Sequence, residues 1–222
     1  MTDRPKKRSK EVVRILAPVL AKFDPPLINL LLPDHGKDPY IILIACLLSL
    51  RARDVVTIHV CRDLFKQAWT PQQMVDIPLV ELEQIIFKTG FYRNKAKVLK
   101  NVSQMLLDRF DGKVPGTETA LLSLPGVGQK TANLVLGMAF GVPAICVDTH
   151  VHRISNRLGI VSTKTPNDTE QALKEVLPED LWIVWNELLV VLGQNICHPT
   201  SPRCSTCPAL AICSQVGVTR KR

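Results

Sequence analysis

The stretch "LPGVGQKTANLVL", residues 124–136, places a proline and two glycines directly before an apolar run with helical spacing. Pro125 fixes its own φ, whereas Gly126 and Gly128 leave the backbone free to turn, so the stretch predicts a tight turn that leads into a helix. Such a turn presents backbone N–H groups to an anion, and Lys130 follows it in the first turn of the helix. Taken alone, two glycines around one residue are also typical of an ordinary loop between core helices.

The charge balance of the 222-residue chain indicates a polyanionic partner. Lys and Arg outnumber Asp and Glu by 28 to 20, a net charge of +8, and a basic surface of this kind is typical of nucleic-acid-binding proteins. The longest apolar run, residues 40–50, is too short to span a bilayer and predicts a buried core helix. No continuous apolar stretch follows the basic N-terminal residues, so we expect no secretory signal, no membrane contact and a cytoplasmic protein.

Apolar residues recur at helical spacing along nearly the whole chain, as at Val56, Val60 and Leu64, which predicts an all-α fold. Helices are expected to begin where a capping residue precedes a proline, at Asp38–Pro39, Thr70–Pro71 and Thr165–Pro166. The one convincing extended stretch, "VPAICV" at residues 142–147, is too short to found a sheet and predicts a buried linker. We expect disorder only in the two basic ends of the chain.

Seven cysteines divide into two groups. Cys46, Cys61 and Cys146 stand singly in apolar surroundings and are expected to be core residues. The other four follow the spacing C-x6-C-x2-C-x5-C, at Cys197, Cys204, Cys207 and Cys213. Four thiolates this close in sequence surround one metal centre at little entropic cost, and a reducing compartment favours such a centre over two disulfides. The spacing alone leaves zinc and an iron–sulfur cluster open.

Three segments together resemble the endonuclease III family of DNA glycosylases, in the helix-hairpin-helix superfamily. They are "LPGVGQKTA" at residues 124–132, "VDTHVHRISNRLG" at residues 147–159, and the four-cysteine spacing. The resemblance extends over nearly the whole chain and includes "LLSLRARD" at residues 47–54 and "KTGFYRNKA" at residues 88–96. It implies a [4Fe-4S] cluster bound by the four C-terminal cysteines.

The resemblance also implies how the chain is divided and what it acts on. We expect a six-helix domain with the helix-hairpin-helix at residues 32–142, and a helical [4Fe-4S] cluster domain built from residues 1–31 and 143–222. The expected function is that of a bifunctional DNA glycosylase and AP lyase of base-excision repair. It would remove oxidised or ring-damaged pyrimidines from duplex DNA, as a monomer associated with the nucleoid.

The resemblance also implies which two residues catalyse the reaction. Lys130 is the expected nucleophile, which attacks the sugar C1′ of an extruded nucleotide and leads to strand cleavage 3′ to the lesion by β-elimination. Asp148 is expected to take the proton of Lys130 and to stabilise the positive charge that develops on the sugar. The alternatives from the residues alone are an exposed helical lysine and a helix-capping aspartate.

The expected DNA contacts lie in three places. The hairpin residues Gly126, Val127, Gly128 and Thr131 would hold a phosphate, and His150 and Arg153 would face the DNA after Asp148, although a surface histidine is equally consistent with the pattern. Phe91 and Arg51 would fill the gap that the extruded base leaves. Phe91 is also consistent with a core aromatic. Arg51 stands where typical members carry glutamine, and its donors suit a guanine edge, so the preference for the opposite base is open.

Three other interpretations compete with the bifunctional enzyme. A monofunctional mismatch glycosylase is disfavoured by Lys130, because relatives without strand cleavage generally lack this lysine. A non-catalytic hairpin DNA-binding protein is disfavoured by Asp148, because a carboxylate repels phosphates. A zinc protein would lack the thiolate-to-iron absorbance of an iron–sulfur cluster.

Overall fold

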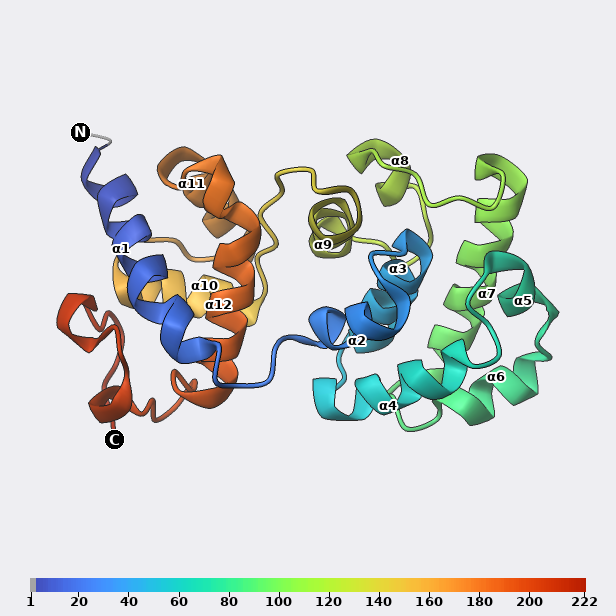
Figure 1. Cartoon of the computed structure of the whole chain (residues 1–222), viewed down its shortest axis with the longest axis horizontal. Coiled ribbons are helices and arrows are strands. Elements are labelled where there is room, and N and C mark those ends of the chain that lie inside the picture. Colours follow the sequence, from blue (N-terminus) through green and yellow to red (C-terminus); the bar gives the residue numbers. More distant parts are fainter. Residues whose placement is uncertain (1–2) are drawn as a thin grey trace. The chain divides into compact units, whose positions relative to one another are not determined.

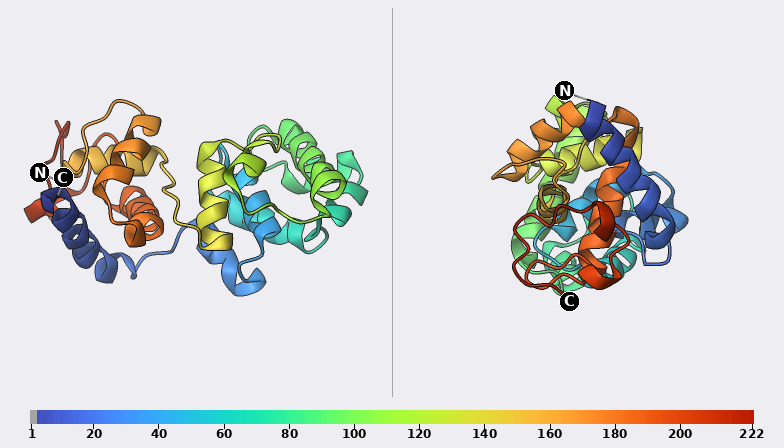
Figure 2. Two further views of the ribbon diagram at one scale, coloured as in Figure 1. Left: turned by 90° about the horizontal axis from the view of Figure 1, so that it is seen from above. Right: turned by 90° about the vertical axis from the view of Figure 1, so that its left-hand side faces the viewer.

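The computed structural model describes residues 3–222, with side chains from residue 6 onward. Over these residues the chain is helical, with no strand, which confirms the all-α prediction. The chain forms two compact units: unit 1 contains the residues up to Pro26 together with Pro143–Arg222, and unit 2 is Leu27–Val142 (Figures 1 and 2). Among the described residues, no helix is long and apolar enough to cross a membrane.

Unit 2 contains six longer helices and two short ones. The longer helices are α2 (Leu27–His35), α3 (Pro39–Ser49), α4 (Asp54–Phe65), α6 (Leu79–Ile86), α7 (Tyr92–Phe110) and α9 (Gln129–Phe140), and the short ones are α5 (Pro71–Asp76) and α8 (Glu118–Leu122). A boundary at residue 32 falls inside α2, which packs against α3 and α4 of the same unit.

Helix α3 is the centre of unit 2. Every residue from Tyr40 to Leu48 is buried, which confirms the predicted core helix, and α3 packs most extensively against α9. Since a helix that is apolar all round must be covered on every side, α4, α7 and α2 also contact it. The helix that begins at the hairpin turn is therefore fixed on a buried apolar support.

The predicted helix starts are confirmed in both units. Asp38 accepts the N–H groups of Tyr40 and Ile41 at the start of α3. Thr70 and Thr165 each form a capping box, with Gln73 and Asp168 respectively. These caps satisfy backbone donors that a helix start otherwise leaves without partners.

Unit 1 packs its helices on α12 (Trp182–Asn195), which contacts α1 (Asp3–Leu20) and α10 (Thr149–Leu158). Its other elements are α11 (Pro166–Val176) and the 3-10 helices η1 (Glu179–Leu181), η2 (Cys204–Thr206) and η3 (Leu210–Ile212). Residues 144–147 are buried without regular structure, as predicted for the linker, whereas Val142 and Pro143 at its start are exposed. Asn186 of α12 supports that linker by donating to the carbonyl of Cys146 at 2.9 Å.

The expected disorder of the basic ends is wrong for the described residues. Helix α1 already begins at Asp3 and includes the basic N-terminal residues, because its apolar face packs on α12. At the other end, the backbone of Arg222 is hydrogen-bonded to Pro202 and Ser205. Residues 1 and 2 lie outside the described residues.

Candidate active site and DNA interface

The turn before α9 has the form that its sequence predicts. The Val127 N–H donates to the Leu124 carbonyl at 3.2 Å, and Gly126 has a left-handed φ of 75°. Proline at the second position and a left-handed glycine at the third are the residues of a type II turn. A Cβ at Gly126 would lie 2.9 Å from a methyl carbon of Val98 on α7. Both the backbone conformation and the lack of space therefore require glycine there.

Gly128 serves a different purpose from Gly126. It is the N-cap of α9, with an ordinary extended backbone (φ −100°, ψ 178°), and a Cβ there would meet nothing within 4 Å. No side chain caps this helix, and its first turn contains no acidic residue. The positive end of the helix dipole therefore faces open space at Gly128.

The remaining predicted hairpin residues differ in exposure. The side chains of Val127 and Thr131 are 7% and 4% exposed, so they support the turn from inside and leave only backbone for a DNA contact. Lys130 is exposed in the first turn of α9. Its charge acts on the thiol of Cys46 on α3, whose pKa burial nevertheless raises to about 12. The buried neighbour of Lys130 is thus an uncharged thiol at neutral pH.

Asp148 is the N-cap of α10 in unit 1. Its Oδ1 accepts the N–H groups of His150 and Val151, both at 2.8 Å, whereas Oδ2 takes no part in the cap. The side chain is half-buried. Asp148 is therefore a helix cap, as the alternative from the residues alone predicted, and it caps through Oδ1. These two hydrogen bonds also fix the direction in which Oδ2 points.

His150 and Arg153 are packed within unit 1. Arg153 donates through Nη2 to the carbonyl of Cys197 at 2.9 Å and through Nη1 to that of Thr149 at 3.2 Å, and burial lowers its pKa. His150 lies within 3.2 Å of the same guanidinium and directly over Gly193 of α12, where any side chain would collide with its ring. Their contacts thus link the start of α10 to the first cysteine of the C-terminal group.

The four C-terminal cysteines are free and half-buried. Burial and, to a smaller extent, the other three thiolates raise the pKa of Cys207 to about 11, so the four sulfurs lie within electrostatic reach of one another. Among the described residues, no three His, Cys, Asp or Glu side chains are arranged as the ligands of a metal ion. The other three cysteines are buried, as predicted for core residues.

Hydrogen-bond donors converge on this cysteine segment. Arg157 of α10, only 8% exposed, approaches Cys197 Sγ at 3.4 Å and donates to the carbonyls of His198 and Pro199 at 2.7 and 2.5 Å. The N–H of Gln215 donates to Cys213 Sγ at 3.4 Å. Donors directed at sulfur stabilise thiolates, which are the form that binds metal, so this donor set fits a thiolate-bound cluster.

Arg51 and Phe91 meet although they are forty residues apart in the sequence. The Arg51 guanidinium lies 5.5 Å from the centroid of the Phe91 ring, a cation–π distance. Phe91 is 64% exposed and is therefore not a core residue. Both residues have left-handed backbones, with φ of 55° and 61°. Such strain in non-glycine residues is concentrated at functional sites.

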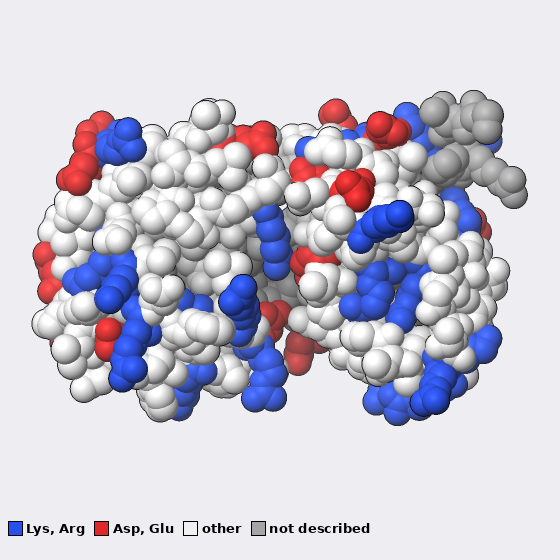
Figure 3. Space-filling view, turned by 180° about the vertical axis from the view of Figure 1, so that it is seen from behind, with Lys and Arg blue, Asp and Glu red and all other residues white. Residues whose placement is uncertain are grey.

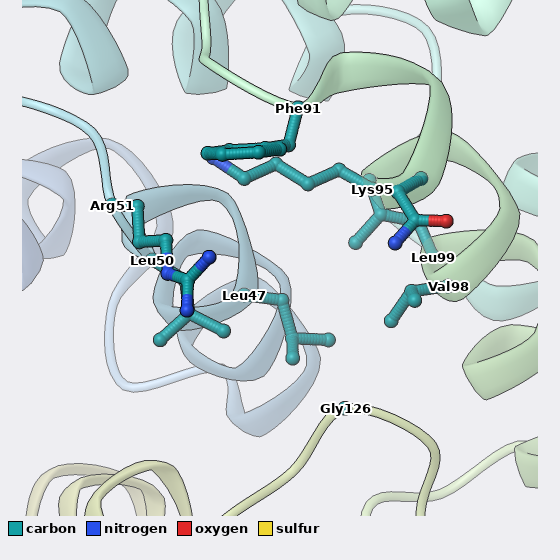
Figure 4. Close-up of a pocket in the computed structure, with 9 residues that line it drawn as sticks. Leu47, Leu50, Arg51, Phe91, Lys95, Val98, Leu99 and Gly126 are labelled. Atoms are coloured by element: carbon teal, nitrogen blue, oxygen red, sulfur yellow. The ribbon is translucent and has the colours of Figure 1, made fainter.

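The pair borders a pocket of about 200 Å³ with apolar walls formed by Leu47, Leu50, Val98 and Leu99 (Figure 4). Phe91 and Gly126 of the hairpin turn lie at its opposite ends. Lys95 also lines it, and its Nζ donates to the carbonyl of Leu48 at 2.7 Å. This buried lysine, which holds the C-terminal end of α3, was missed from the sequence, and its place in the "KTGFYRNKA" segment was the only signal.

Comparison with known proteins places the chain in a family. Residues 44–179 match the model of the HhH-GPD superfamily of base excision DNA repair proteins. The endonuclease III of Thermotoga maritima is 47% identical over 170 residues, which cover 77% of this chain and 80% of that protein. The endonuclease III of Bacillus subtilis is 41% identical over 179 residues, which cover 80% and 82%.

Solved structures agree with this assignment. A trapped covalent intermediate of an endonuclease III with DNA is 37% identical, with a TM-score of 0.77 over 93% of this chain and 96% of that one. A thermostable thymine-DNA glycosylase is 26% identical, with a TM-score of 0.80 over 94% and 96%. The chain therefore belongs to the endonuclease III family of base-excision DNA glycosylases and AP lyases, within the HhH-GPD superfamily.

Proposed function

We propose that this family member removes oxidised or ring-damaged pyrimidines from duplex DNA and cleaves the strand 3′ to the lesion through a Schiff base on Lys130. The observation that carries the proposal is an exposed lysine in the first turn of a helix whose start has no capping side chain. An endonuclease III that is 37% identical has been trapped as a covalent intermediate with DNA. A nucleophilic side chain is what such a covalent complex requires.

The hairpin turn is proposed to bind one phosphate of the damaged strand. The N–H groups around Gly128 and the positive end of α9 attract an anion, and the absence of a Cβ at Gly128 leaves the space that a phosphate needs. This contact reads no sequence, but it fixes the position of the strand relative to Lys130. A similar endonuclease III has been solved in a non-covalent complex with DNA.

The proposed reaction breaks the glycosidic bond, then the C1′–O4′ bond of the sugar ring, and finally the C3′–O3′ bond. Lys130 Nζ attacks C1′ of the extruded nucleotide, the glycosidic bond breaks, and the base leaves with the bonding electron pair and a proton. The C1′–O4′ bond of the sugar ring then opens, with O4′ taking up a proton and the Lys130 nitrogen losing one, which leaves a Schiff base at C1′. The Schiff base acidifies the protons on C2′, and loss of one of them breaks the C3′–O3′ bond and expels the 3′ phosphate by β-elimination. Asp148 takes the proton of Lys130 and stabilises positive charge on the sugar. Its cap through Oδ1 holds the carboxylate in one direction.

Arg51 and Phe91 are proposed to fill the gap that the extruded base leaves. The exposed ring supplies a stacking surface, and the guanidinium beside it supplies donors for the orphaned base. Arginine pairs with the O6 and N7 atoms of guanine, so this pair favours guanine opposite the lesion.

The four C-terminal cysteines are proposed to hold a [4Fe-4S] cluster. Support comes from the four free thiols, from the N–H groups that approach two of the sulfurs, and from membership of the endonuclease III family. When bound, the cluster supplies a rigid brace for the loops between the cysteines. Brown colour and thiolate-to-iron absorbance of the purified protein would distinguish it from zinc. We further propose a monomer that acts on the nucleoid in the cytoplasm.

Borohydride trapping tests the function directly. The purified protein is incubated with a duplex that carries one thymine glycol, with an abasic duplex, and with a duplex that carries a G·T mismatch. We expect a trapped complex and a nicked strand on the first two, both lost in Lys130→Ala. Excision on the G·T duplex without trapping on any of the three would contradict the lyase mechanism and favour a monofunctional enzyme. Binding to the thymine glycol duplex without excision would contradict the catalytic proposal.

A further inference from the structure

The last nine residues of the chain are ordered against the cysteine segment. Here we name residues 214–222 the C-terminal strap. After Cys213 the strap reverses in a turn closed by the Val218 N–H on the Gln215 carbonyl at 3.1 Å. Lys221 Nζ then donates to the Gln215 side chain at 2.8 Å. The strap is thus folded upon itself before it reaches its end.

Two backbone hydrogen bonds dock the end of the strap. The Arg222 N–H donates to the Pro202 carbonyl at 2.9 Å, and the Arg222 carbonyl accepts the Ser205 N–H at 2.9 Å. Because both polar groups of one peptide residue are paired with the same loop, the register is fixed. Arg222 is therefore held beside Arg203, in the loop between the first and second cysteines of the C-terminal group.

This pairing concentrates positive charge. Arg203, Arg220 and Arg222 are exposed, and residues 188–222 contain no Asp or Glu. Basic side chains gather without acidic neighbours at the lower edge of unit 1 in Figure 3, where Figure 1 places the chain end. An ordered arrangement of guanidinium groups loses less conformational entropy on binding a polyanion than a disordered tail does.

We propose that Arg220 and Arg222 of the docked strap bind phosphates of the DNA backbone, as a contact additional to the hairpin turn. Guanidinium groups pair with phosphate through parallel N–H donors. The docking of Arg222 fixes the backbone from which its side chain extends, and its Nη2 donates to the Ser201 carbonyl at 3.5 Å. The inference rests on the proposed action on duplex DNA. It predicts a contribution to affinity that is independent of sequence and sensitive to salt.

The test compares two doubly substituted proteins of equal charge. In Arg220→Ala/Arg222→Ala the backbone pairing of residue 222 is kept, and Arg14→Ala/Lys164→Ala removes two exposed charges from elsewhere in unit 1. Binding to an undamaged duplex is measured by fluorescence anisotropy across a range of salt concentrations. Loss of two phosphate contacts lowers the salt slope by about 2 and weakens binding about thirtyfold at 0.15 M salt. We expect that loss for the strap variant and less than about threefold for the control.

Each outcome separates the strap from the proposed function. Single-turnover excision of thymine glycol at saturating DNA should stay within about twofold of wild type in both variants, because the strap contributes binding and not chemistry. Equal losses of affinity in the two variants, or no loss in the strap variant, would overturn the proposal while leaving the glycosylase intact. Failure of the wild-type protein to excise thymine glycol would instead contradict the proposed function, whatever the strap binds.

Discussion

The two helices that carry the proposed catalytic residues, α9 and α10, have nearly the same backbone conformation at the N-cap. They differ in whether a side chain caps the first turn. The N-cap of α9, Gly128, has φ −100° and ψ 178°, and the N-cap of α10, Asp148, has φ −101° and ψ −171°. At α10 a carboxylate oxygen closes the helix start. At α9 no side chain does. The capped start fixes a carboxylate of the protein, whereas the uncapped start is the one at which we propose that a DNA phosphate binds.

Substitution of Asp148 separates its charge from its cap. Asn keeps an oxygen that accepts the two backbone N–H groups but removes the charge, so Asp148→Asn should retain stability within about 0.5 kcal/mol. Single-turnover excision of thymine glycol should fall by about 10² to 10⁴, the usual contribution of a positioned acid or base.

The control is Asp148→Ala, which removes both the charge and the cap. It should lose the same activity and a further ~1 kcal/mol of unfolding free energy, measured by urea denaturation. Equal activity of Asp148→Asn and wild type would mean that Asp148 only caps α10 and that its charge has no role in catalysis. The two helix starts would then differ in structure but not in chemistry.

Gly128→Asp converts the uncapped start into a capped one. A Cβ at this position meets nothing within 4 Å, so the side chain fits and adds a few tenths of a kcal/mol of stability. The new carboxylate occupies the proposed phosphate site. Loss of one phosphate contact and repulsion between the charges each weaken binding about fivefold, so affinity for duplex DNA should fall about twentyfold or more at 0.15 M salt.

Gly128→Ala is the uncharged control for this change. It adds a methyl group to the open space without a charge or a cap, and its loss of affinity should be smaller than that of Gly128→Asp, as fluorescence anisotropy would show. Unchanged affinity in Gly128→Asp would contradict a phosphate site at this helix start.

Features that depend on neighbours in the sequence were predictable. The turn at Gly126, the cap at Asp38 and the apolar run of α3 follow from local backbone preferences and from side chains a few residues apart, and the structure bears them out. Family resemblance supplied what local rules could not, because no local pattern assigns a nucleophile to Lys130.

Features that depend on distant contacts were not predictable. The approach of Arg51 to the Phe91 ring joins two loops that the sequence separates, and Phe91 is exposed rather than buried. The hydrogen bond from Arg153 to the Cys197 carbonyl joins α10 to a residue forty-four positions away, and its DNA contact stays a prediction. The basic C-terminal end reads as a disordered tail until the docking of Arg222 is known.

Gly126→Ala should have the smallest effect on the reaction and a clear effect on folding. Two separate costs act there: the left-handed φ of 75° and the approach of a new Cβ to within 2.9 Å of Val98. Together they should lower the free energy of unfolding by about 1 to 2 kcal/mol. Excision at saturating DNA should remain within about twofold of wild type, because Gly126 supports the turn and the proposed phosphate site lies at Gly128.

The two costs are separated by adding Val98→Ala. In a double-mutant cycle, that substitution should relieve the steric part of the Gly126→Ala loss and leave the conformational part. A Gly126→Ala protein that is as stable as wild type but binds DNA more weakly would contradict the roles given to the two glycines, namely support of the turn by Gly126 and phosphate binding at Gly128. The left-handed glycine, rather than the uncapped helix start, would then be the part of the hairpin that contacts the phosphate, and the contrast between α9 and α10 would lose its functional meaning.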